Sequence, residues 1–136
     1  MIGVKTFKLR KLVILDYDKG LEGTEVHLID GLIINREDDH DTWLIEGFIN
    51  RSYWNYFKDK LNEELMVQAT ITKDTNEPAS FITKLTEMHE IGEQMNVMLM
   101  GKIIDKQKKD VEQLLTRLVE KGYEGENLIQ KFKEVY

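Results

Sequence analysis

The sequence contains no cysteine and a single proline among its 136 residues. Without cysteine the chain has no disulfide, no thiol chemistry and no thiolate metal site. Long apolar runs are also missing. The run from Leu12 to Leu15 is too short for the core of a signal peptide, and no segment approaches the length of a membrane span. These absences predict a cytoplasmic protein with no membrane partner.

Basic residues are outnumbered, and the net charge of −6 is unevenly distributed. Residues 16–50 carry ten Asp or Glu against Lys19 and Arg36. An acidic middle segment repels phosphate backbones, so we expect no nucleic-acid partner. The residues that would favour one are four bases near the start of the chain: Lys5, Lys8, Arg10 and Lys11.

A chain of this length is the size of one domain and can bury a hydrophobic core without disulfide bonds. Six segments have the alternating or doubly apolar pattern of strands. They span residues 4–15, 26–34, 43–49, 65–72, 81–88 and 95–104. Short connections between sequential strands predict a mainly β protein with a mostly antiparallel sheet that is closed or nearly closed. The glycine-containing, acidic stretch 16–24 reads as a surface loop.

The strand pair at 25–49 is the centre of this sheet. Both faces of Trp43–Ile49 are largely apolar, which predicts a strand covered by the core on one side and by a helix or a neighbouring element on the other. Asp30-Gly31 interrupts the preceding strand. It fits a hairpin turn, because a type I′ turn needs positive φ at both central residues, or a bulge that bends one long strand.

Two regions have helical spacing. Tyr53, Phe57 and Leu61 recur behind the capping residue Ser52 and predict a helix inserted at about 52–64. From residue 105 the apolar residues predict two helices separated by Gly122, which is placed to end the first. We therefore expect a core over 1–104 and a C-terminal helix pair over 105–136, whose apolar stripes pack on each other, on the barrel or on a partner.

Four motifs and the acidic loop after the second motif resemble a known family. The motifs are KTFKL (Lys5–Leu9), LIDGLIIN (Leu28–Asn35), WLIEGF (Trp43–Phe48) and EPASF (Glu77–Phe81). Over nearly its full length the chain resembles the YwpF-like family of small, uncharacterised proteins of Gram-positive bacteria. The resemblance implies a six-stranded β-barrel followed by a two-helix pair, the barrel being similar to the tube-forming protein of type VI secretion systems. It implies no activity, cofactor or catalytic residue.

One cluster has metal-binding chemistry: Glu37, Asp38, Asp39, His40 and Asp41. Carboxylates of this density can hold Ca²⁺ or Mg²⁺, and the imidazole could admit a transition metal. The EF-hand spacing is absent, because its twelfth position is occupied by Phe48. The alternative is a solvated loop that keeps a strand end soluble, and we favour it, expecting no metal and no cofactor.

Catalytic motifs are absent from the sequence, and His27, His40 and His89 are its only histidines. We therefore predict a non-enzymatic module for protein interaction or self-assembly. Its candidate interaction surface comprises Tyr56, Leu114, Leu118 and Phe132. Met95, Met98 and Met100 fit either core filling or an adaptable contact surface. The alternative is a ligand- or metal-binding protein, or an enzyme, that uses the loop 37–41 or a pocket in the barrel.

Overall fold

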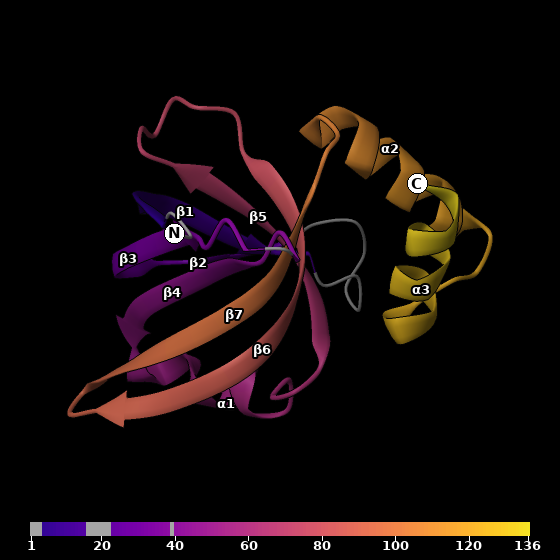
Figure 1. Ribbon diagram of the computed structural model, residues 1–136. Helices are drawn as coiled ribbons and strands as arrows, with labels where there is room; N and C mark the ends of the chain where they lie inside the picture. The colour runs from indigo at the N-terminus through magenta and orange to yellow at the C-terminus, as the bar shows by residue number, and fades with distance from the viewer. Residues whose placement is uncertain (1–3, 16–22, 39) are drawn as a thin grey trace.

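A computed structural model describes residues 4–15, 23–38 and 40–136 (Figure 1). Its strands are β1 (Lys5–Ile14), β2 (Thr24–Val26), β3 (Leu28–Asn35), β4 (Trp43–Asn50), β5 (Glu64–Ile71), β6 (Ala79–Ile91) and β7 (Gln94–Ile104). Its α-helices are α1 (Trp54–Lys58), α2 (Lys108–Glu120) and α3 (Gly125–Val135). The expected surface loop at 16–24 lies mostly outside the described residues, as does Asp39.

The strands form a closed antiparallel barrel. Their order is β2-β1-β3-β4-β7-β6-β5, and an additional pairing of β1 with β5 closes the sheet on itself. β2 and β3 both pair with β1, at its two ends, so β2 is a short strand added to a barrel of six. The predicted six-stranded, mainly β fold with a C-terminal helix pair is thus confirmed, with β2 as the extra strand.

Asp30 and Gly31 lie inside β3, so the hairpin alternative is wrong. The register of β3 against β4 shifts between Leu28 and Asp30, which places the irregularity at Ile29. Gly31 is needed for space at this point rather than for a positive φ. A Cβ on Gly31 would lie 3.1 Å from Cβ of Leu9, so only hydrogen fits easily between the two strands.

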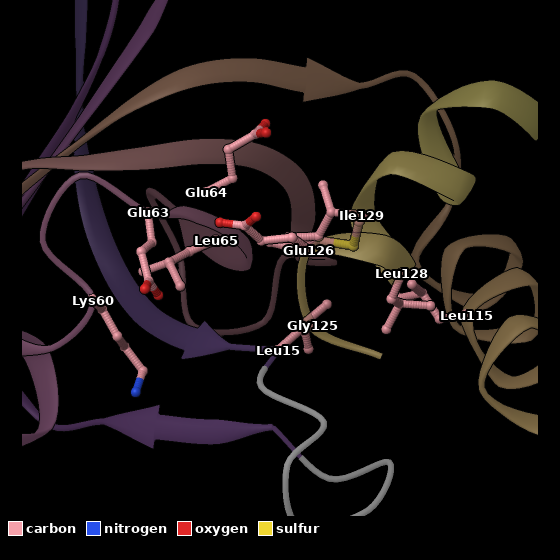
Figure 2. A pocket seen from close by; sticks show the side chains of 11 residues that line it. Leu15, Lys60, Glu63, Glu64, Leu65, Leu115, Gly125, Glu126, Leu128 and Ile129 are labelled. Carbon is pink, nitrogen blue, oxygen red and sulfur yellow. The ribbon is translucent and has the colours of Figure 1, made fainter. Parts of the chain in front are cut away.

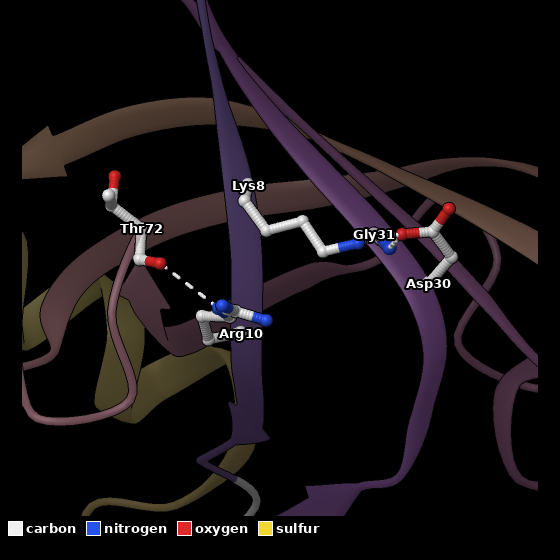
Figure 3. Close-up of polar contacts among 5 residues, drawn as sticks. All are labelled: Lys8, Arg10, Asp30, Gly31 and Thr72. Atoms are coloured by element: carbon white, nitrogen blue, oxygen red, sulfur yellow. Dashed lines mark hydrogen bonds and ion pairs between the residues drawn. The ribbon is translucent and has the colours of Figure 1, made fainter.

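β1 is anchored by polar contacts on both of its sides (Figure 3). On one side the ammonium group of Lys8 forms an ion pair with Asp30 of β3. On the other side Nε of Arg10 donates a hydrogen bond of 3.0 Å to the carbonyl oxygen of Thr72, which follows β5. These contacts reinforce the two pairings that close the barrel.

The barrel interior is a single apolar cluster to which every one of its six main strands contributes. α1 contributes Phe57, which is fully buried, and Trp43 contacts Phe81 edge-to-face with ring centroids 5.5 Å apart. Met95 belongs to this cluster, whereas Met98 and Met100 lie outside it on the outer face. The three methionines therefore divide between core filling and the surface.

The inserted helix is shorter than the sequence predicts. A 3₁₀ turn over Arg51–Tyr53 leads into α1, which ends at Lys58. Asn62 has a φ of +66°, and its backbone N–H donates to Leu85 O at 2.8 Å. The chain is thereby drawn alongside β6, and Leu61 is 42% exposed instead of continuing the apolar stripe.

The helix pair packs on the outer face of the barrel wall formed by β5, β6 and β7. A second buried cluster joins Met66 and Ile104 of the wall to Val111 and Leu115 of α2 and to Leu128 and Phe132 of α3. Gly122, with a φ of +95°, follows the end of α2, where the sequence placed the helix terminator. The apolar stripes of both helices are thus buried within this chain.

Candidate functional site

The helix pair has a groove on its surface, which we call the helix-pair groove. It has a volume of about 470 Å³ and is lined by Leu114, Arg117, Leu118, Lys121, Tyr123, Lys131 and Val135. Arg117 and Lys121 are exposed, and Val135 is 50% exposed. The lining thus combines apolar side chains with three cations and no carboxylate. On an acidic chain this is a local basic surface that suits an acidic, partly apolar segment of protein.

Lys131 is the groove cation that is held in place. Its Nζ lies 3.3 Å from the carboxylate of Glu134 and 5.8 Å from the ring centroid of Tyr123. The hydrogen bond that Lys131 donates to the Glu134 carboxylate, together with the nearby Tyr123, raises the pKa of Lys131 above its ordinary value. Arg117 and Lys121 make no side-chain ion pair with any described residue, so their charges are available to a bound molecule.

The side chains predicted as an interaction surface lie in different environments. Phe132 is fully buried and Leu118 is 4% exposed, so both pack inside the protein in this arrangement. Leu114 is half-buried and lines the helix-pair groove. Tyr56 is half-buried beneath the barrel, with Nζ of Lys60 lying 4.2 Å from its ring centroid. Of the four, Leu114 and Leu118 line the groove beside exposed cations, and of these two only Leu114 is partly exposed.

Arg117 and Lys121 are the groove residues that the sequence analysis did not single out. Arg117 lies on α2 and Lys121 caps its C-terminal end, three positions beyond Leu114 and Leu118 respectively, so both lie on the helical side of these leucines. Cations at this spacing beside an apolar stripe are the sequence signal that could have located the groove.

A narrower cleft separates the end of the barrel from the helix pair (Figure 2). The barrel contributes Glu63 and Leu65 to its lining, and α3 contributes Glu126 and Leu128. Its volume is about 130 Å³. Pockets for drug-sized molecules have volumes of about 300–1,000 Å³, so this cleft is a joint between two packed parts rather than a ligand pocket.

The described residues of the acidic segment, Glu37, Asp38, His40 and Asp41, lie at the tip of the β3–β4 hairpin. The backbone N–H groups of Thr42 and His40 donate to one carboxylate oxygen of Asp38, at 2.9 and 3.1 Å. The bond from Thr42 in particular lowers the pKa of Asp38. Glu37 pairs with Lys5 at 3.2 Å. Within the described ranges, which omit Asp39, no three acidic or histidine side chains are grouped as a metal site would need.

The histidines lie on separate elements and are exposed. His27 lies between β2 and β3, His40 lies in the hairpin tip, and His89 lies on β6, where its Nε2 is 4.0 Å from Glu87. Of the helices in the described part of the chain, none is long and apolar enough to cross a membrane.

Comparison with known proteins agrees with the fold. The profile of the YwpF-like protein family matches residues 5–135. The uncharacterized protein YwpF of Bacillus subtilis is 37% identical over 134 residues, which is 96% of this chain and 98% of the relative. A crystal structure of a hypothetical protein from Staphylococcus aureus superimposes with a TM-score of 0.71 and 28% identity, covering 95% of this chain and 90% of that one. The chain therefore belongs to the YwpF-like family.

Proposed function

We propose that this protein is a non-enzymatic, cytoplasmic, self-assembling module in which the helix-pair groove of one copy binds an acidic surface of a second copy. The observation that carries the proposal is the groove itself, which has two unpaired cations beside apolar side chains on a chain of net charge −6. Complementary charge steers association and fixes the orientation of the partners.

The tip of the β3–β4 hairpin is the acidic surface that fits this groove best. Glu37 and Asp41 are exposed there, and Asp41 forms no ion pair within the described residues. Both have positive φ, of 50° and 52°, in a turn closed by a hydrogen bond of 3.1 Å from Arg36 N to Thr42 O. Asp41 is therefore the carboxylate of this tip that we expect to enter the groove, because Glu37 already pairs with Lys5.

Because the groove and the hairpin tip are different surfaces, the proposed contact is head-to-tail. Contacts of this kind form rings when the rotation closes and open filaments when it does not. A ring would fit the resemblance to the tube-forming barrel of type VI secretion systems that the sequence motifs imply. That resemblance belongs to the proposal only and does not identify any residue of the contact.

Charge reversal in the groove tests the proposal. The double substitution Arg117→Glu and Lys121→Glu is compared with Lys58→Glu and Lys73→Glu, which changes the net charge equally at exposed positions outside the groove. By sedimentation velocity, we expect wild type and control to form a larger species that the groove variant does not form. Equal sedimentation of all three proteins would contradict self-assembly through the groove.

Two alternatives have weaker support. An acidic segment of another protein could occupy the same groove, and the groove variant would then lose that protein instead of a second copy. A metal- or ligand-binding protein, or an enzyme, could use the segment 37–41, although backbone N–H groups already occupy one carboxylate oxygen of Asp38. A ligand of the folded state raises the thermal midpoint. An unchanged midpoint with common divalent ions would exclude the metal version.

A further inference from the structure

The outer face of β3, β4 and β7 has an apolar surface, which we call the apolar wall. Its six side chains are Leu32, Ile34, Leu44, Phe48, Met98 and Met100. They are direct or diagonal neighbours across three adjacent strands. The alternate residues Ile33, Ile45 and Leu99 are fully buried in the barrel, so the wall residues point outward.

No described helix packs on the centre of the apolar wall, and at its edge Met100 lines a surface hollow together with Lys133 and Tyr136. The six side chains of the wall are half-buried and belong to neither buried cluster. α2 contacts β6 and α3 contacts β5, on the side of the barrel where Figure 1 shows the helix pair. The helix pair therefore does not supply the cover that the sequence predicts for the outer face of Trp43–Ile49. An apolar sheet face on which no helix packs is a candidate interaction site.

A single carboxylate stands at the centre of this wall. Glu46 of β4 is paired with Leu32 of β3 and with Met98 of β7, and Leu44 and Phe48 flank it along its own strand. Nδ2 of Asn96 donates to it at the long distance of 3.4 Å. Glu46 has no ion pair with any residue in the described ranges. A molecule that covers the wall must therefore supply a cation, since an unpaired buried charge is costly.

The central carboxylate argues against the same wall of a second copy as the occupant. If two walls met face to face about a two-fold axis, two Glu46 side chains would be enclosed opposite each other with no counter-charge. The size of the wall points the same way. Three strands about 4.8 Å apart and three rows of side chains cover roughly 14 by 20 Å, far less than the roughly 800 Å² that each partner buries in a stable dimer.

We propose that the apolar wall binds one amphipathic helix of a partner protein, with a Lys or Arg in its apolar stripe placed against Glu46. A helix of about 13 residues is about 20 Å long and about 10 Å wide, which matches the wall. The chain has an internal precedent for this packing. α2, of 13 residues, buries Val111 and Leu115 against Met66 and Ile104 on the outer face of the same barrel.

This inference does not depend on the proposed self-assembly, because the wall and the helix-pair groove share no residue. A change that abolishes binding at one surface should leave the other intact. The experiments on the two surfaces can therefore fail separately.

The test uses a phage-displayed library of amphipathic helical peptides of about 15 residues, selected on the full-length protein. We expect the selected peptides to have an apolar stripe interrupted by one Lys or Arg. Their affinity should fall at least about tenfold for Phe48→Asp and for Glu46→Lys, as is typical for central contacts. Replacing the peptide cation by Glu should restore binding to Glu46→Lys.

Two controls isolate the wall. Glu25→Lys makes the same change of charge at an exposed position on β2, and Arg117→Glu alters the helix-pair groove. Both should bind the selected peptides as wild type does, and every variant is first checked for an unchanged thermal midpoint. Should Phe48→Asp fail to fold, Glu46→Lys carries the test alone, because it leaves the apolar side chains in place.

Several outcomes would overturn the inference. One is an empty selection, and another is a set of peptides without the cation. A third is binding that neither wall variant alters. If Phe48→Asp or Glu46→Lys instead lowered the mass of a wild-type oligomer while the groove variant did not, the occupant of the wall would be a second copy.

Discussion

A Cβ built on Gly101 would lie 2.0 Å from the carbonyl oxygen of Ile82 and 2.6 Å from Cα of Thr83. β6 and β7 therefore approach so closely that only hydrogen fits on Gly101, and the obstructing atoms belong to the backbone. We predict that Gly101→Ala lowers the free energy of unfolding by about 2–3 kcal/mol, because the strands must separate to admit the methyl group. Urea denaturation measures this change.

Gly92 is the matched control for Gly101. It lies at the turn between β6 and β7, with open space where a Cβ would be and a φ of +62°. Gly92→Ala should cost about 1–2 kcal/mol, through left-handed strain alone. A smaller loss of unfolding free energy for Gly101→Ala than for Gly92→Ala would contradict the close approach of β6 to β7.

Substitutions of Leu118 and Leu114 distinguish the packing of α2 in the protein from its role in association. Leu118 is 4% exposed, and its replacement by alanine should lower the free energy of unfolding by about 2–5 kcal/mol. Leu114 is half-buried and lines the groove, so Leu114→Ala should cost about 1 kcal/mol or less and should weaken self-association. Thermal unfolding and sedimentation measure the two effects. A stable Leu118→Ala variant would contradict the packing of α2 on the barrel.

Asp38 makes stability depend on pH. The hydrogen bond from Thr42 N–H lowers its pKa below the ordinary value of 3.8 in the folded state. The ionised carboxylate therefore contributes stability above pH 3.8, and this contribution is lost as the pH falls through the lower folded pKa. We predict that Asp38→Asn, which keeps an acceptor oxygen but cannot ionise, makes the loss of thermal stability in acid less steep.

Direct titration checks the cause of this pH effect. The carboxyl carbon of Asp38 is followed by NMR in the folded protein and in the urea-unfolded chain. The folded value should be the lower of the two. A folded pKa at or above 3.8 would contradict the hydrogen bond from Thr42 N–H to the ionised Asp38 carboxylate.

Thr72 has backbone strain that a substitution can relieve. It has a φ of +71°, which is unfavourable for a β-branched residue, and it follows β5 where its carbonyl oxygen accepts from Arg10. Thr72→Gly keeps the backbone groups. It should raise the free energy of unfolding by about 0.5–1 kcal/mol. Removing the left-handed backbone strain gains about 1–2 kcal/mol, which exceeds the entropy penalty of glycine.

Thr75 provides the control in the same exposed loop, since its φ is not positive. Thr75→Gly should lower the free energy of unfolding, because glycine there adds only chain entropy to the unfolded state. If both glycine variants lost stability equally, the left-handed conformation of Thr72 would not hold in solution.

Much of the fold follows from local patterns in the sequence. Alternation of apolar residues located the main strands, and helical spacing together with Gly122 located α2 and α3. Closure of the barrel depends on the pairing of β1 with β5, between residues more than fifty positions apart, and local periodicity contains no information on it. The sequence offered a bulge at Asp30-Gly31 as one of two alternatives, but the place of the irregularity at Ile29 appears only when β3 is aligned with β4.

Surfaces were harder to anticipate than strands. Tyr53, Phe57 and Leu61 have helical spacing, yet hydrogen bonds between Leu85 and the Asn62–Glu63 segment end the helical stretch early. The stripe of the helix pair predicted correctly that apolar side chains must be buried, but not that Phe132 would be buried against the barrel. Which face of an amphipathic element remains free depends on distant neighbours.

Self-assembly through the helix-pair groove is tested most directly by the solution mass of the full-length protein. Light scattering over a wide range of concentrations is recorded at about 0.1 M and about 1 M salt, where the screening length falls from about 10 Å to about 3 Å. The proposal predicts a mass that rises with concentration to that of a defined oligomer or filament in low salt and returns toward 16.0 kDa in high salt. A mass of one chain at every concentration in low salt would contradict it.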